Sequence, residues 1–137
     1  MNKANPMGIA MIICDQIITE DKTNKKSLMG CFNNVSAAQF PTAPMNCAVF
    51  VALTDGHGAY QGKLECVNED AGREPIFGMG GPVVFANPLQ TIELGFKLVN
   101  LSFPKPGTHA ITFSCDGEII LHRRFTVKQI APNEVMP

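Results

Sequence analysis

Hydrophobic and polar residues alternate at every second position in two long stretches of the chain. Between Thr91 and Leu101, apolar side chains alternate with polar ones, among them Glu93 and Lys97. Tyr60–Asn68 has the same pattern. Because successive side chains of a strand point to opposite faces of a sheet, both stretches are predicted to be strands with one buried face.

Two further stretches are apolar on both faces. In Met45–Thr54, hydrophobic side chains fill both sets of alternate positions, which predicts a central strand covered on both sides. Gly8–Thr19 has isoleucines at helical spacing, but its adjacent Ile-Ile pairs favour a strand that is kinked near Asp15. The polar tip Glu20–Lys26 then turns the chain and Ser27–Val35 returns, which predicts a long hairpin.

Glycine and proline mark the breaks in the middle of the chain. Glu69–Pro75 is a polar loop. Ile76–Gly78 and Val83–Ala86 follow it and are predicted to be two short strands, separated at the glycines and proline of Gly80–Pro82.

The turn signal Asp116-Gly117 predicts a hairpin near the end of the chain. A two-residue loop would mix apolar and polar side chains on each face. A three-residue loop that includes Cys115, with the glycine in the left-handed region, groups the apolar side chains on one face, so hydrophobic matching favours it. In this register Phe113 lies opposite Ile119, and Ile111 lies opposite Leu121.

The composition favours an all-β fold. Val, Ile and Thr total 28 residues and Gly and Pro total 22, against 8 Leu in a chain of 137. β-Branched residues suit pleated sheets, and frequent Gly and Pro interrupt helices. We therefore predict one domain over residues 1–137, with short extended tails at both ends. Its fold is a two-sheet immunoglobulin-like β-sandwich of about seven to nine strands, with a closed barrel as the alternative.

Charge and hydropathy exclude several classes of partner. Eleven basic and twelve acidic residues give a net charge of −1, which provides no electrostatic surface for nucleic acid or an anionic membrane. The apolar run Met7–Cys14 is short for a secretion signal and has no small-residue cleavage site after it. No stretch reaches the ~18 apolar residues of a membrane span. We expect a cytoplasmic protein.

The five cysteines are Cys14, Cys31, Cys47, Cys66 and Cys115. Their spacing contains no CxxC pair, and their odd number is incompatible with a complete set of disulfides. Most lie in apolar runs. We predict buried thiols that act as small hydrophobic side chains, and no zinc site.

Three features are candidates for chemistry, although each has a structural explanation. His57 lies in a turn between Asp and Gly residues. Gly78–Pro82 is glycine-rich, but a strand follows it, where a phosphate-binding loop needs a helix. Asp15 interrupts an apolar strand, which a bulge or a backbone hydrogen bond would explain. His109 and His122 are predicted on opposite strand faces and therefore share no metal. We assign no catalytic, cofactor-binding or metal-binding residue, and no cofactor.

Basic residues gather at His122-Arg123-Arg124 near the end of the chain. A phosphate contact is one interpretation. Protection of an exposed strand edge is the favoured one, because charged side chains discourage pairing with another chain. The predicted register points Arg123 toward the apolar side, with its guanidinium at the rim.

Two groups of residues together carry a resemblance to a known family. The first is Asp15–Ile18 with Lys25–Phe32 and Phe40-Pro41; the second is Phe103–Gly107 with Asp116-Gly117 after it. From about Met11 to Val127, the chain resembles a family of small bacterial proteins classed as a domain of unknown function. The resemblance implies a β-sandwich and no particular activity.

The absence of every catalytic template that we searched for favours a protein that is not an enzyme. We expect a protein-binding or assembly module that associates with itself, because the strands that are apolar on both faces need cover. One alternative is a small-ligand-binding protein or an enzyme whose site is built from loops. The other is a structural subunit of a larger particle or filament.

Overall fold

A computed structural model describes residues 3–132, and this part of the chain is built from β-strands without a helix. Consequently, no helix in it could span a membrane. Predicted tail residues 1–2 and 133–137 lie outside the described part. The strands are β1 (Met7–Thr19), β2 (Lys26–Cys31), β3 (Asn34–Ala37), β4 (Met45–Thr54), β5 (Gly58–Asn68), β6 (Glu74–Phe85), β7 (Ile92–Leu101), β8 (Gly107–Cys115) and β9 (Glu118–Gln129).

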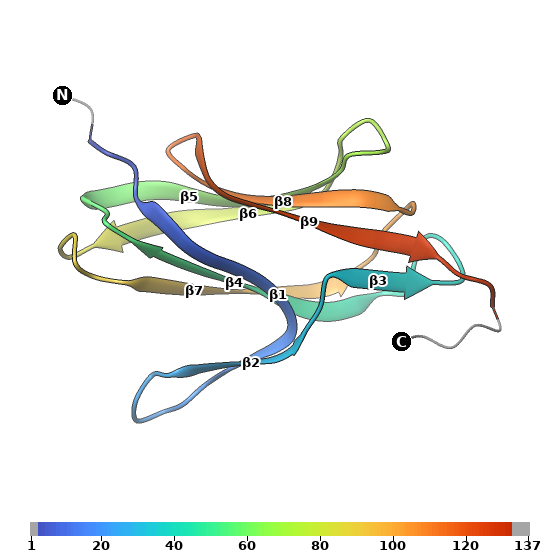
Figure 1. The fold of residues 1–137 in the computed structure, drawn as a ribbon, viewed down its shortest axis with the longest axis horizontal. Coiled ribbons are helices and arrows are strands. Elements are labelled where there is room, and N and C mark those ends of the chain that lie inside the picture. Colours follow the sequence, from blue (N-terminus) through green and yellow to red (C-terminus); the bar gives the residue numbers. More distant parts are fainter. Residues whose placement is uncertain (1–2, 133–137) are drawn as a thin grey trace.

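The strands form two sheets that pack face to face, which confirms the all-β sandwich (Figure 1). The four-stranded sheet has the order β2-β1-β4-β7, and the five-stranded sheet has the order β3-β9-β8-β5-β6. All neighbours are antiparallel except β3 and β9, which run parallel. Both sheets contribute to the core between them, with Leu53 from one and Leu64 and Phe113 from the other fully buried.

Strand β4 lies at the centre of its sheet, as its apolar faces predicted. It pairs with β1 on one side and β7 on the other. Val49 and Val51 point into the core, and Phe50, on the opposite face, is only 8% exposed. Phe50 lies beside Gly95 of β7, and a Cβ on Gly95 would be 3.3 Å from Ile17 of β1. The outer face of this sheet is therefore partly covered by the chain itself.

The predicted long hairpin exists, but its second strand is shorter than expected. Strand β1 pairs with β2 only as far as Cys31. Val35, which we placed in the same strand, belongs to β3 and pairs with Val127 of β9 in the other sheet. The local pattern missed this crossing because a parallel pair between segments about ninety residues apart leaves no local signal.

Glu74–Phe85 is one continuous strand, so the prediction of two short strands is wrong. Gly80–Pro82 lies within it, and Pro82 is opposite Gln61 of β5. A proline lacks the amide proton that a ladder needs, yet β6 tolerates it because an edge strand pairs on one side only.

The register predicted for the last hairpin is also wrong. Cys115 is opposite Glu118, so the loop has two residues, and Asp116 and Gly117 have φ values of 51° and 86°. Phe113 is opposite Leu121, and Ile111 is opposite Arg123; the extra residue is a bulge inside β9. The turn is held by β5, since the Asp116 amide donates to the Gln61 carbonyl at 2.9 Å and the Gln61 amide donates to Asp116 Oδ1 at 2.8 Å. These hydrogen bonds to Gln61 hold the turn in a register that differs from the one predicted by hydrophobic matching within the hairpin.

Candidate functional site

The β1–β2 hairpin extends beyond the four-stranded sheet as an arm, which we define as residues 15–30 (Figure 1). Strand β1 pairs with β4 only up to Cys14; from Gln16 to Thr19 it pairs with β2 alone. At this point Gly30 has φ +68°, and the Asp15 side chain occupies the space that a Cβ on Gly30 would need. The arm leaves the sheet where these two residues pack against each other.

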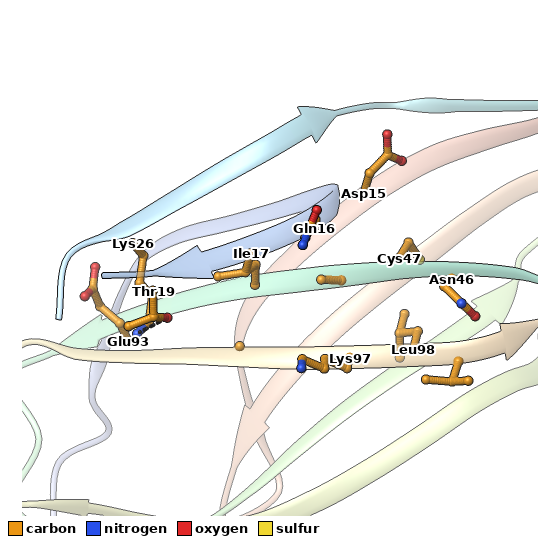
Figure 2. Close-up of a pocket in the computed structure, with 13 residues that line it drawn as sticks. Asp15, Gln16, Ile17, Thr19, Lys26, Asn46, Cys47, Glu93, Lys97 and Leu98 are labelled. Atoms are coloured by element: carbon orange, nitrogen blue, oxygen red, sulfur yellow. Dashed lines mark hydrogen bonds between the residues drawn. The ribbon is translucent and has the colours of Figure 1, made fainter. Parts of the chain in front are cut away.

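A groove of about 800 Å³ lies between the arm and the outer face of β4 and β7. It is lined by polar and charged side chains from both sides and by the apolar surface of the sheet. Figure 2 places Thr19, Lys26 and Glu93 together at one end, whereas Asp15 lies at the other end with its carboxylate directed away from Lys97. The two carboxylates are therefore not arranged as a catalytic pair. This arm groove is open, and its lining offers hydrogen bonds and charges of both signs.

The three residues singled out from the sequence do not converge. Asp15 is exposed and lines the arm groove, while His57 and Gly78–Pro82 lie elsewhere. His57 is exposed in the turn before β5, and its backbone amide donates to the Tyr60 hydroxyl at 2.9 Å. That hydroxyl donates to the Ala4 carbonyl at 2.7 Å, so the turn serves to hold the N-terminal segment.

His109 is fully buried in the core. Its ring lies 5.1 Å from the ring of Phe103 and 5.3 Å from that of Phe125, and Nδ1 is 3.0 Å from the Gly107 carbonyl. Within the described residues, Nε2 has no hydrogen-bond partner. Burial lowers the pKa of His109, so the ring is neutral near pH 7. His122 is exposed on the opposite face, as predicted.

The basic cluster near the chain end consists of side chains with separate structural contacts. Arg124 Nε donates to Glu69 Oε1 at 2.7 Å; this contact lowers the pKa of Glu69 and raises that of Arg124. Arg123 points to the apolar side, as predicted, and its guanidinium donates to the Met11 carbonyl at 2.7 Å and to Asn33 Oδ1. The topology places β9 inside its sheet, between β3 and β8, so the favoured interpretation of this cluster as protection of an exposed edge is wrong. Arg123 instead links β9 to β1 of the other sheet and to the segment before β3.

Four of the five cysteines are buried, as predicted, but Cys31 is exposed. Burial raises the pKa of Cys47 and Cys115 to about 11 and that of Cys66 to about 12, which keeps these thiols protonated and unreactive at neutral pH. Cys31 lies directly opposite Cys14. Among residues 3–132, no group of three or more His, Cys, Asp and Glu side chains could hold a metal ion.

The free edge of β7 is the feature that the sequence reading did not single out. Eight of the ten residues of β7 pair with β4, and within residues 3–132 no strand pairs with its other side. Its outer face carries Glu93, Gly95, Lys97 and Val99, and Val99 is 66% exposed. A second groove of about 500 Å³ lies at this edge, between β7 and β6. The alternating pattern identified the strand, but its position at an edge depends on the sheet order.

The edge strands of the sandwich differ in how they are protected. Strand β6 contains Pro75 and Pro82, β3 has four residues, and β2 has six and contains Gly30 in a left-handed conformation. Prolines, short length and irregular backbone all discourage pairing with another chain. In contrast, residues 92–98 of β7 form a regular ladder with no proline.

The two-sheet sandwich formed by the described residues defines the class of this protein as all-β. The chain belongs to the family of unknown function DUF6941, whose model matches residues 9–128, and the resemblance noted in the sequence is thus confirmed. No curated protein matches the chain. Among solved structures, a β-glucosidase from Listeria innocua in complex with glucose is similar at 11% identity and a TM-score of 0.46. The match covers 72% of this chain and 15% of that one.

Proposed function

We propose that this protein is an assembly module that forms a homodimer by joining the β7 edges of two copies into one continuous antiparallel sheet. The observation that supports this most directly is the free, regular edge of β7. Such an edge presents unpaired backbone amides and carbonyls, and an added strand satisfies them.

The side chains of β7 are complementary to those of a second, antiparallel β7. With the two-fold axis at Gly95, Glu93 of each copy lies opposite Lys97 of the other. On the core side, Leu94 lies opposite Phe96. Opposite charges across strands contribute roughly 0.2–1 kcal/mol per pair, and this register contains two such pairs.

Neighbouring registers that keep the same faces lose this complementarity. A shift of the pairing by two residues in either direction places neither charge opposite its counterpart. A shift by four residues would put Glu93 opposite Glu93, or Lys97 opposite Lys97. Like charges directly opposite each other are destabilising. The Gly95-centred register is therefore the favoured one.

A dimer of this kind closes on itself. The two-fold axis is perpendicular to the sheet, so the same edge is buried in both copies and no free β7 remains. This geometry favours a dimer over the filament subunit considered from the sequence. It also places both arm grooves on the same side of an eight-stranded sheet.

Charge exchange tests the proposal. We expect Glu93→Lys and Lys97→Glu each to weaken dimerisation by about 10-fold or more, because each replaces two attractive pairs with two repulsive ones. An equimolar mixture of the two variants should dimerise again, since both positions are then basic in one chain and acidic in the other, which restores two attractive pairs. Sedimentation velocity over a range of micromolar concentrations measures this.

The exposed Lys128 of β9 provides a matched control, because Lys128→Glu changes the net charge equally on the other sheet. This variant should dimerise like the wild type. A wild-type chain that is monomeric at all these concentrations, or a mixture that stays monomeric, would contradict the proposal.

A small-ligand-binding role is the second candidate, and the arm groove is the observation that favours it. Carboxylates and ammonium groups in one groove suit a polar ligand that carries both charges. Chemical-shift changes confined to groove residues in a titration with amino acids would support this role, whereas unchanged spectra would remove it.

A further inference from the structure

Cys14 and Cys31 form a cross-strand pair at the base of the arm. They are directly opposite each other in β1 and β2. The Phe32 amide, one residue after Cys31, donates to the carbonyl of Ile13, one residue before Cys14, at 3.0 Å. A bond in this position identifies the two cysteines as a non-hydrogen-bonded pair of an antiparallel ladder, with Cα atoms about 4.5 Å apart and side chains on one face.

This spacing fits a disulfide. Disulfides join cysteines whose Cα atoms are about 4.4–6.8 Å apart and whose Cβ atoms point to the same side. A disulfide between these positions therefore needs no change in the register of the ladder. The reduced pair is therefore already placed for oxidation.

The two thiols differ in access. Cys31 is exposed, and Cys14 has 0% of its surface accessible. Burial, with smaller contributions from the neighbouring Cys31 and Asp15, raises the pKa of Cys14. An external reagent can thus reach Cys31 first, and Cys14 can attack only a sulfur that is already beside it. Cys31 also lies on β2, at the opposite edge of the sheet from β7, and stays accessible in the dimer proposed above.

We propose that Cys14 and Cys31 are a thiol–disulfide exchange site whose substrates are low-molecular-weight disulfides of the glutathione type. The Cys31 thiolate attacks one sulfur of the small disulfide, which forms a mixed disulfide and releases one small thiolate. The Cys14 thiolate then attacks the Cys31 sulfur and releases the second. The two protein thiols lose two protons and two electrons, and the small disulfide becomes two thiols.

The bond would fasten the arm where it leaves the sheet. Asp15 and Gln16, which line the arm groove, follow Cys14 directly, and Gly30 with its left-handed backbone precedes Cys31. Oxidation therefore ties both strands of the arm together at their base and fixes one wall of the groove. Reduction leaves the two strands joined only by their backbone ladder.

The experiment uses the full chain in buffers of varied reduced-to-oxidised glutathione ratio, followed by rapid alkylation and intact mass measurement. We expect the wild type to lose two hydrogens without an added glutathione, with peptide mapping that links Cys14 to Cys31. Cys14→Ser should stop at the mixed disulfide and gain one glutathione, because no resolving thiol remains. Cys31→Ser should form neither the internal disulfide nor the mixed disulfide with glutathione.

Cys115→Ala is the matched control, because it removes a buried thiol far from the pair and should oxidise like the wild type. In the wild type, limited proteolysis at the arm tip should be slowed several-fold by oxidation and unchanged in Cys31→Ser. A wild-type chain that carries a stable glutathione at Cys31, or that forms only a disulfide between two chains, would overturn the proposal. So would a chain that remains fully reduced in oxidised glutathione.

Discussion

The two sheets of the sandwich differ in how well their edge strands are protected from pairing with another chain. In the five-stranded sheet, one edge strand is short and the other contains two prolines. In the four-stranded sheet, β7 has a regular free edge, and the arm at the opposite edge borders a groove and carries an exposed thiol. The difference indicates that the five-stranded sheet serves as a stable scaffold. The sites that we propose for thiol exchange and for association both lie on the other sheet.

The largest effect should come from truncating a core residue of the scaffold. Leu64 of β5 is fully buried, so Leu64→Ala should lower the free energy of unfolding by about 2–5 kcal/mol. Leu94→Ala, on the partly buried edge strand β7, should cost about 1 kcal/mol. Urea denaturation, at concentrations where the protein is monomeric, measures both. Equal losses would contradict the expected difference between a buried central strand and the free edge strand.

Removing the prolines of β6 should make the protected edge resemble the free one. In Pro75→Thr/Pro82→Thr, β6 regains two backbone donors, and each chain then has two edges available for pairing. We expect species larger than a dimer in sedimentation velocity. Pro104→Thr, in an exposed loop, is the control and should leave the size distribution unchanged. If the double variant also leaves the size distribution unchanged, the prolines are not what prevents β6 from pairing with another chain.

The buried histidine should make the scaffold sensitive to acid. Burial lowers the pKa of folded His109, whereas the unfolded chain titrates near the ordinary value of about 6.5. The unfolded state therefore binds a proton at higher pH, and stability should decline as the pH falls below about 6.5. His109→Phe should remove this contribution. Urea midpoints measured between pH 8 and pH 5 test this, and parallel curves for both proteins would refute it.

The smallest effect should come from the ion pair on the outer face of the scaffold. Glu69 and Arg124 contact each other at 2.7 Å, but Arg124 is exposed, and water and salt screen such pairs. We expect Arg124→Ala to leave the urea midpoint unchanged within experimental error. A clear destabilisation would indicate that the pair orders the Glu69–Pro75 loop.

The sequence predicted the strands well where buried and exposed residues alternate regularly along the chain. The bounds of β4 agree with the predicted Met45–Thr54, and the buried faces of β5 and β7 follow the alternating pattern. The register between strands was harder to predict where hydrogen bonds to a distant strand determine it. Asp116 and Gly117 were identified as the turn, but the register depended on Gln61, a residue 55 positions away from Asp116.

The candidate sites were largely hidden from sequence reading. Cys14 and Cys31 are 17 residues apart and belong to no recognised motif, and only the ladder between β1 and β2 places them opposite each other. The arm groove combines residues from both ends of the four-stranded sheet. The order of the strands in the sheet brings these residues together, and a local pattern in the sequence does not encode that order.

The sequence by itself determined the class of fold and, for the strands with regular alternation, the faces that they bury, because a period of two in hydrophobicity is a local property that burial enforces. Only the tertiary structure decided which strands lie at an edge, where the arm leaves its sheet and which two thiols meet. These features follow from backbone hydrogen bonds between distant segments, and every residue except proline can make such bonds.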